Sequence, residues 1–418
     1  MLLCVAALIT ALGMALVCIA MHYELVRATR GIALMAVLLG CSLLMDLAGS
    51  GRDRSLLPIV AMISGIGIVL LWRLDPLHAS KQIVWMMIGS GLMLATYVAI
   101  VDVRDLRGLK YVSGVTAALL LLATMIWGYE VNGAKLWLNL GFVRVQPGEV
   151  AKILMAVFLA AYTAQRGEIM GQVGRDRLGL RLVELRYLGP IAVVVVFCLA
   201  IFVTQRDLGA AVLFFGLAVA MMYLGTGRRA YALVGLAAFA GGALLATEMF
   251  PHVHRRMLGW LDPWSDPTNA GMQALQGMFA LAEGGLLGTG LGQGMPLKIP
   301  EVTTDLIFGA VGEELGLIGT CGLLILYAMA VYTGFSIAWR SRDRFGMLLA
   351  AGLTTMFGLQ ALVIVGGVIR AVPLTGITLP FVSYGGTSVV VNYIAVGLLL
   401  AVSRDCAGPG RRAPDGHG

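Results

Sequence analysis

The chain has 418 residues, of which 59% are hydrophobic and only 13% are charged, whereas about a quarter of the residues in a soluble domain are charged. With a mean hydropathy of +0.88, this composition excludes a soluble enzyme, a disordered protein and a disulfide-stapled secreted domain. The net charge of +7 is not gathered into a basic stripe with interleaved aromatic side chains, so no nucleic-acid partner is expected. The six cysteines form no CxxC pair and no Cys/His cluster, so no metal centre or disulfide framework is indicated.

Long apolar runs predict an all-α polytopic membrane protein, because a helix satisfies its own backbone hydrogen bonds in lipid. About 20 apolar residues are needed to cross a bilayer as a helix. Candidate spans lie near residues 1–21, 31–48, 56–72, 82–101, 111–129, 148–165, 187–204, 208–225, 230–248, 306–337, 346–369 and 384–403. This pattern predicts about twelve transmembrane helices.

Basic residues in the connecting loops predict the orientation of these helices. An even number of spans places both termini on one side, and eighteen lysines and arginines then face that side against eleven on the other. Because basic residues collect in cytoplasmic loops, we expect both termini in the cytoplasm. The largest loop, 249–305, is then extracellular, whereas 165–186 is a basic cytoplasmic loop. Residues 405–418 are predicted to form a disordered cytoplasmic tail.

The first polar motif precedes and opens the sixth span. It begins with a segment that contains Trp137 and continues as Gln-Pro-Gly-Glu-Val-Ala-Lys at 146–152. Pro147 suits the first position of a helix, and Glu149 and Lys152 are three residues apart, so their side chains can pair. Two interpretations stay open: a structural ion pair, or a polar lining for an anionic head group with Lys152 as the phosphate partner.

The second motif, Thr-Gln-Arg-Asp-Leu-Gly at 204–209, lies at the outer start of the eighth span. Asp207 can cap that helix by accepting a hydrogen bond from an early N–H group. Arg206 beside it is suited to bind phosphate.

The third motif region is the extracellular loop. It contains an aromatic turn at 260–264, a segment at 271–276 that includes Gln273, and a glycine-rich stretch at 283–292. No strand precedes these glycines and no Gly-Lys-Ser follows them, so they do not form a nucleotide-binding loop. They do allow backbone to approach backbone or ligand closely.

The extracellular loop ends with Pro-Glu-Val-Thr-Thr-Asp-Leu-Ile-Phe at 300–308, which includes Glu301, Thr304 and Asp305. A carboxylate in the half-buried mouth of a span can have a raised pKa and act as a general base. The alternative interpretation of Asp305 is a helix N-cap.

The fourth motif is the polar segment 373–388, which includes Ser383 and is broken by proline and glycine. Non-helical backbone at membrane depth is tolerated only where it is buried or lines a cavity, so this segment is a candidate cavity wall. Arg370 just before it is a cation within the membrane or at its interface. The five histidines form no metal-ligand pattern, and we interpret His252, His254, Arg255 and Arg256 as an interfacial basic cluster.

In this order the motifs resemble those of the SEDS family (shape, elongation, division and sporulation), which includes RodA, FtsW and SpoVE. The resemblance covers about residues 56–404 and rests on positions 81–82, 137–141, 146–152, 207–209, 262–292, 300–308, 312–319 and 379–386. It implies a core of ten transmembrane helices in 55–404, which contains the large extracellular loop. Residues 1–54 would add two N-terminal helices, an arrangement similar to actinobacterial RodA-type members.

The resemblance implies a peptidoglycan glycosyltransferase that polymerises lipid II at the outer face of the cytoplasmic membrane. The family's essential aspartate corresponds to Asp305, and its paired glutamate and lysine correspond to Glu149 and Lys152. Asp305 would deprotonate the acceptor hydroxyl, while Lys152, Arg206 and Arg370 would hold pyrophosphate. The other substrate-binding candidates are Trp137, Glu149, Asp207, Gln273, Glu301, Thr304 and Ser383.

The family also implies a class B penicillin-binding protein as partner, because this chain lacks the Ser-x-x-Lys and Lys-Thr-Gly motifs of a transpeptidase. No cofactor is certain, although a divalent cation, Mg²⁺ or Mn²⁺, could assist. Two alternatives stay open: a lipid II flippase, which intramembrane charges also suit, and a non-enzymatic scaffold of the wall-synthesis complex. The extra N-terminal helices favour a role in elongation over division or sporulation by analogy alone.

Overall fold

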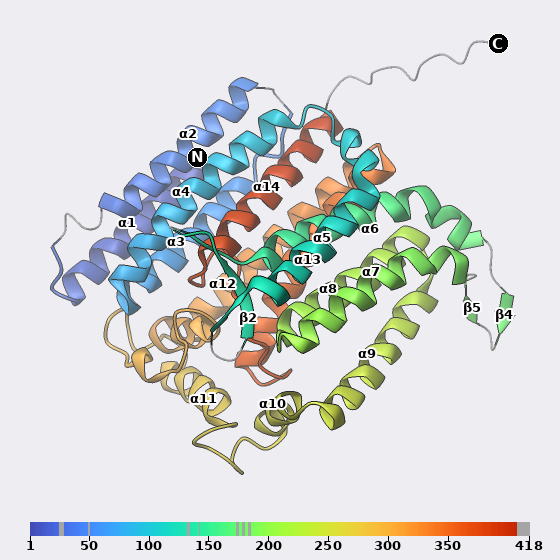
Figure 1. Cartoon of the computed structure of the whole chain (residues 1–418). Coiled ribbons are helices and arrows are strands. Elements are labelled where there is room, and N and C mark those ends of the chain that lie inside the picture. The colour runs from blue at the N-terminus through green and yellow to red at the C-terminus, as the bar shows by residue number, and fades with distance from the viewer. Residues whose placement is uncertain are drawn as a thin grey trace.

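The computed structural model describes residues 1–24, 29–48, 51–131, 134–141, 143–172, 175–177, 180–182 and 185–407. Within these residues, eleven helices are long and apolar enough to cross a membrane, and Leu188–Thr204 is a shorter apolar helical segment. These segments coincide with the twelve predicted spans, which confirms an all-α polytopic membrane protein. Figure 1 shows them as a bundle of helices that run roughly side by side.

Along the chain, the strands β1–β3 and the loop that contains α10, α11 and η3 interrupt the series of long helices. The helices are α1 (Leu2–Ala20), α2 (Thr29–Ala48), α3 (Leu56–Leu74), α4 (Pro76–Ala99), η2 (Val103–Leu109), α5 (Lys110–Trp127), α6 (Pro147–Gln172), α7 (Leu185–Thr204), α8 (Leu208–Thr226), α9 (Arg229–Met249), α10 (Pro251–Leu261), α11 (Met272–Gly284), η3 (Pro296–Lys298), α12 (Ile307–Arg340), α13 (Arg344–Val368) and α14 (Gly386–Ala407). The strands are β1 (Tyr129–Val131), β2 (Ala134–Asn139), β3 (Arg144–Val145), β4 (Arg175–Arg177) and β5 (Leu180–Leu182).

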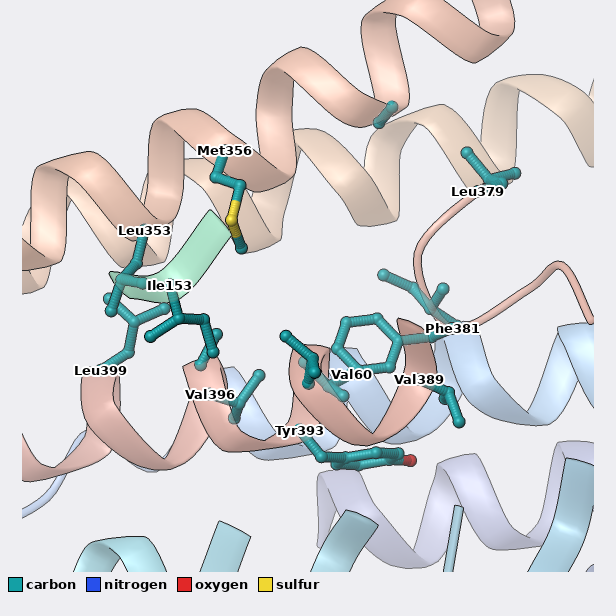
Figure 2. Packing of buried hydrophobic residues seen from close by; sticks show 14 of the residues in the cluster. Val60, Ile153, Leu353, Met356, Leu379, Phe381, Val389, Tyr393, Val396 and Leu399 are labelled. Atoms are coloured by element: carbon teal, nitrogen blue, oxygen red, sulfur yellow. The ribbon is translucent and has the colours of Figure 1, made fainter. Parts of the chain in front are cut away.

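The centre of the bundle is formed by α3, α6, α13 and α14, which are the most deeply buried helices. Because lipid tails are as apolar as leucine, packing and interhelical hydrogen bonds drive the association of such helices. Tyr393 of α14 illustrates both, since its ring packs edge-on against Phe381 and its hydroxyl lies 2.9 Å from that of Ser64 in α3. Figure 2 shows this core: Val60 of α3 and Tyr393 of α14 lie near Phe381, whereas Ile153 of α6 lies with Leu353 of α13 and Leu399 of α14.

The two N-terminal helices pack on one side of this core, α1 against α3 and α2 against α4 (Figure 1). Gly65 of α3 allows the close approach of α1, because a β-carbon there would lie 2.0 Å from Oγ1 of Thr10. Residues 1–48 thus add a helical pair beside α3 and α4, and α3 becomes buried from both sides.

The extracellular loop predicted at 249–305 is largely folded, into α10, α11 and η3. Its glycine-rich part fits against a break in α12 at Gly316, where φ is 65° and ψ is −164°. The N–H groups of Thr289 and Gly290 donate to the carbonyls of Glu313 and Glu314, at 2.9 and 3.0 Å. The loop therefore satisfies backbone groups that the break in the helix leaves without an intrahelical partner.

The non-helical segment between α13 and α14 is held from α4 and α12. The amide of Gln82 donates to the carbonyl of Ser383 at 3.0 Å and accepts from the N–H of Gly385 at 3.1 Å. The hydroxyl of Tyr327 donates to the carbonyl of Pro380. Side chains thus replace the helical hydrogen bonds that this segment lacks at membrane depth.

Two predicted boundaries differ from the structure. The basic cytoplasmic loop predicted at 165–186 is shorter, because α6 continues to Gln172 and α7 begins at Leu185. The predicted tail begins later than residue 405, since α14 continues to Ala407. The rest of the tail lies outside the described residues.

Candidate functional site

A cavity of about 890 Å³ opens among the helix ends at which the polar motifs converge. Its walls come from α4, the β2–β3 hairpin, α6, α8, α10, α11, the turn before α12 and the non-helical segment before α14. The volume is near the upper end of the range for ligand pockets. Among the residues that line it are the predicted Trp137, Glu149, Lys152, Arg206, Asp207, Gln273, Glu301, Thr304, Asp305 and Arg370.

Asp305 lies in the turn that precedes α12, half-buried at the cavity wall. The N-cap of α12 is Leu306, with no side-chain cap, so the N-cap interpretation of Asp305 is wrong. Its carboxyl has no hydrogen bond or ion pair with any described residue. Burial raises the pKa of Asp305 to about 7, the charge of Glu301 adds to this effect, and Arg256 opposes it. A carboxyl with a pKa near the working pH suits a general base.

Arg256 of α10 is a site residue that sequence analysis missed. Its Nη1 donates to the carbonyl of Leu374 at 3.3 Å. Gly376 lies next to both this guanidinium and Asp305, because a β-carbon on Gly376 would lie 3.6 Å from Nη2 of Arg256 and 3.5 Å from Oδ2 of Asp305. The spacing of Arg256 and Trp260 could have identified it, since residues four apart share a helix face and both line the cavity.

Asp207 caps α8, as one interpretation of its motif predicts, because its Oδ1 accepts from the N–H of Ala210 at 2.9 Å. It also lines the cavity, where burial and the charge of Glu149 raise the pKa of Asp207. Arg206 before it has a left-handed backbone, with φ at 62°, and its guanidinium has no hydrogen-bond or ion-pair partner in the described chain. Such strain costs about 1–3 kcal/mol and is typical of functional sites.

Glu149 and Lys152 form the predicted pair, with Nζ 2.7 Å from Oε2 in ion-pair rather than hydrogen-bond geometry. Nζ also donates to Oε1 of Gln360 in α13 at 3.3 Å, and Nε2 of Gln360 donates to the carbonyl of Thr378 at 2.7 Å. The pair therefore ties α6 to α13 and to the non-helical segment while it lines the cavity. The structural and the lining interpretations describe the same two residues.

Arg370 lines the cavity, but its donors are already used. Its Nε donates to the carbonyl of Trp260 at 2.7 Å and its Nη2 to that of Leu261 at 2.6 Å. In return, the indole of Trp260 donates to the carbonyl of Arg370 at 3.0 Å. This residue therefore fastens the C-terminal end of α10 to the end of α13, which makes it a weaker candidate for binding pyrophosphate than the sequence indicates.

Ser383 is buried behind the cavity wall and does not line it, which corrects its prediction as a substrate-binding residue. Its hydroxyl accepts from the N–H of Leu379 at 2.8 Å and donates to the carbonyl of Thr304 at 2.5 Å. Ser383 therefore positions the turn that carries Asp305.

Among the described residues, no group of three His, Cys, Asp or Glu side chains is placed to hold a metal ion.

Taken together, the fold and the cavity define a multi-pass membrane protein with a carboxyl and several cations gathered where many of its helices end. The family model described as "Cell cycle protein", for FtsW, RodA and SpoVE, matches residues 54–407. The peptidoglycan glycosyltransferase RodA of Mycobacterium tuberculosis is 37% identical over 375 residues, which cover 87% of this chain and 80% of the relative. Stage V sporulation protein E of Bacillus subtilis is 30% identical over 84% of this chain and 97% of its own length. The chain belongs to the FtsW/RodA/SpoVE family.

Solved structures agree with this assignment. A chain from a peptidoglycan synthase complex that coordinates polymerization and crosslinking has a TM-score of 0.71 and 30% identity, and the match covers 85% of this chain and 98% of that one. The rod shape determining protein RodA of Thermus thermophilus has a TM-score of 0.61 and 27% identity, over 86% and 98% of the two chains. These matches confirm the predicted SEDS-type fold.

Proposed function

We propose that this chain polymerises lipid II into glycan strands at the outer face of the cytoplasmic membrane. It is a peptidoglycan glycosyltransferase, the activity named for its mycobacterial relatives. The mechanism rests on one observation about Asp305. Its carboxyl lines the cavity, has no partner among the described residues and has a pKa of about 7. A carboxyl of this kind is available for proton transfer near neutral pH.

Asp305 accepts the proton of the sugar 4-hydroxyl of the incoming lipid II. The hydroxyl oxygen then forms a bond to the anomeric carbon of the donor glycan. The bond from that carbon to the diphosphate oxygen breaks, and polyprenyl diphosphate leaves with the electron pair. A single displacement of this kind inverts the anomeric configuration.

Arg206 and Arg256 balance the charge that develops on the leaving diphosphate. Both line the cavity, and the guanidinium fork matches the oxygens of a phosphate. Preorganised cations in a site with little water stabilise a developing charge more than water does. A divalent cation, Mg²⁺ or Mn²⁺, would arrive with the diphosphate, because Mg²⁺ is commonly held by substrate phosphates together with one or two carboxylates.

The orientation of the bundle is part of the proposal. Both termini are cytoplasmic, as the distribution of lysine and arginine favours, and the cavity then opens on the outer side, where lipid II presents its sugars. The product glycan requires crosslinking, which a class B penicillin-binding protein would supply. A structural relative belongs to a synthase complex that joins these two steps.

The test is polymerisation of lipid II by the purified chain, with and without its penicillin-binding partner. Asp305→Asn removes the base and keeps the shape, so we expect a loss of about 100-fold or more. Glu283→Gln is the matched control, because Glu283 is exposed in the same loop and does not line the cavity.

Equal polymer from wild type and Asp305→Asn would keep the enzyme class and remove Asp305 from its mechanism. No polymer from wild type, even with partner and metal present, would favour the flippase or the scaffold. Transport of lipid II across vesicle membranes would then separate those two.

A further inference from the structure

The α4 wall of the cavity carries two basic side chains that the proposed mechanism does not use. His78 and Lys81 both line the cavity, three residues apart on the first turns of α4. Trp85 continues the same helix face, and its indole packs so closely under Gly386 that a β-carbon there would lie 2.6 Å from Nε1. In Figure 1, α4 lies with α1–α3, away from α8 and α10. Arg206 lies in the turn just before α8, and Arg256 lies on α10.

The ring of His78 is held in place from two sides. Its Nδ1 lies 2.5 Å from Oδ2 of Asp75, and its face meets Tyr384 edge-on with ring centroids 4.3 Å apart. Oδ1 of Asp75 accepts from the backbone N–H groups of Leu77 and His78, at 2.8 and 3.1 Å, so this carboxylate is itself fixed. Because Nδ1 faces Asp75, Nε2 is the ring nitrogen left to meet a ligand.

Lys81 is exposed, and its ammonium has no hydrogen bond or ion pair in the part of the chain that the structure describes. The backbone that carries it is nevertheless fixed, because the neighbouring Gln82 is fully buried and bonded to Ser383 and Gly385. A lysine that lines a polar cavity without an acidic partner is a cation for which the fold supplies no counter-charge. An anionic ligand would supply it.

One basic side chain from each pair, Arg256 and His78, contacts an opposite end of the non-helical segment between α13 and α14. Arg256 lies at Leu374 and Gly376, near its beginning, whereas His78 lies at Tyr384, near its end. The turn that carries Asp305 touches both ends. Gly376 borders Asp305 itself, and the N–H of Tyr384 donates to the carbonyl of Thr303 at 2.8 Å. The turn that carries the general base therefore contacts both ends of this segment, the end beside Arg256 and the end beside His78.

We propose that His78 and Lys81 form a second diphosphate-binding subsite, which holds one lipid-linked substrate while Arg206 and Arg256 hold the other. This inference rests on the proposed function, since a polymerase of this kind joins two substrates that each carry a polyprenyl diphosphate. The shared chemistry of the ligand is a diphosphate, whether borne by a lipid or free in water.

The test is the binding stoichiometry of radiolabelled farnesyl diphosphate to the full-length chain in lipid nanodiscs. We expect two equivalents on wild type and one on His78→Gln/Lys81→Gln. Arg206→Gln/Arg256→Gln is expected to lose the other equivalent. Each lost site should weaken by about 10-fold or more, as expected for charge-assisted hydrogen bonds. Competition with inorganic pyrophosphate identifies the source of the ligand. A site for a lipid-borne diphosphate should keep its labelled farnesyl diphosphate, whereas a site for free diphosphate should release it.

Lys135→Gln is the matched control, because Lys135 is exposed on the nearby strand β2 and does not line the cavity. Lys81→Arg should retain binding, and Lys81→Gln alone should weaken one site without lowering the thermal unfolding midpoint, since the Lys81 ammonium has no partner among the described residues. Two unchanged equivalents on His78→Gln/Lys81→Gln would overturn the proposal, as would a single wild-type equivalent that depends on Arg206 and Arg256. Binding requires no turnover, so these results are independent of the polymer assay on Asp305→Asn.

Discussion

Asp305 differs from the other inward-facing acids because its side chain has no hydrogen-bond or ion-pair partner among the described residues. Asp207 and Asp75 cap helices, while Glu149 and Glu314 pair with cations. A half-buried carboxyl without a partner lowers the stability of a fold when it is ionised. Its presence at the cavity is therefore explained by chemistry rather than by stability, and removing its charge should not unfold the chain.

The pKa of Asp305 predicts the pH profile of polymerisation. Because the protonated acid cannot accept a proton, kcat/KM should rise with pH and level off above an apparent pKa of about 7. Glu301→Gln removes a negative neighbour that raises this pKa, so the profile should shift toward lower pH. Rates measured between pH 5 and 9 check both expectations. An identical profile for Glu301→Gln would show that another group controls the rate.

The contacts of Gly376 lead to a prediction about the space beside Asp305 and Arg256. Alanine there would place a methyl group 3.5 Å from Asp305 and 3.6 Å from Arg256, on a backbone whose φ of 76° disfavours a side chain. We expect Gly376→Ala to reduce polymerisation by about 10- to 100-fold, because small displacements at a reacting centre are costly. Gly322→Ala, on the exposed side of α12 with open space around it, is the control and should retain activity.

At the scale of elements, the long apolar runs were sufficient to predict the spans. The run at 208–225 became Leu208–Thr226 and the run at 230–248 became Arg229–Met249, because the thickness of the bilayer determines both the composition and the length of a span. The β1–β3 hairpin, α10 and α11 were not predicted. They are short, and they are stabilised by contacts with the bundle that a single sequence does not contain.

The difference between long spans and short docked elements also explains which site residues the sequence could identify. Asp305, Glu149 and Lys152 lie in motifs beside predicted spans, so their location at one cavity followed from the order of the helices. Arg256 lies on α10, inside a segment interpreted as a loop, and its orientation depends on how that helix docks. The role of Arg370 likewise depended on the position of α10, which carries the carbonyls that its guanidinium binds.

The docking of α10 leads to a prediction about Arg370. Arg370→Lys cannot donate to both Trp260 and Leu261 in the same fork geometry, and each lost hydrogen bond costs about 1–3 kcal/mol. We expect faster amide exchange across α10 and a lower kcat, because Arg256 moves with that helix. Hydrogen exchange by mass spectrometry checks this, with exposed Arg342 mutated to lysine as the control. Unchanged exchange in α10 would show that other contacts hold it.

At the scale of the whole molecule, Asp305 is held by helices that are far apart in sequence. Arg73 at the end of α3 pairs with Glu314 of α12 at 2.9 Å, and both side chains are buried. Arg73 also donates to the carbonyl of Gly294 in the 249–305 loop at 3.1 Å. The first part of α12, which follows Asp305 directly, is thus joined to α3, and α3 in turn carries the N-terminal pair α1 and α2.

This buried pair predicts a non-additive effect on stability. Removal of one partner leaves an uncompensated charge, so Glu314→Gln or Arg73→Met should each cost about 3–5 kcal/mol, whereas the double change to Arg73→Met/Glu314→Leu should cost less than either. Thermal unfolding in detergent measures these differences. Polymerisation by the double variant then separates stability from positioning: if the pair also orients the Asp305 turn, activity stays low although stability returns. A loss of stability in the double variant equal to the sum of the two single losses would show instead that the charges act independently.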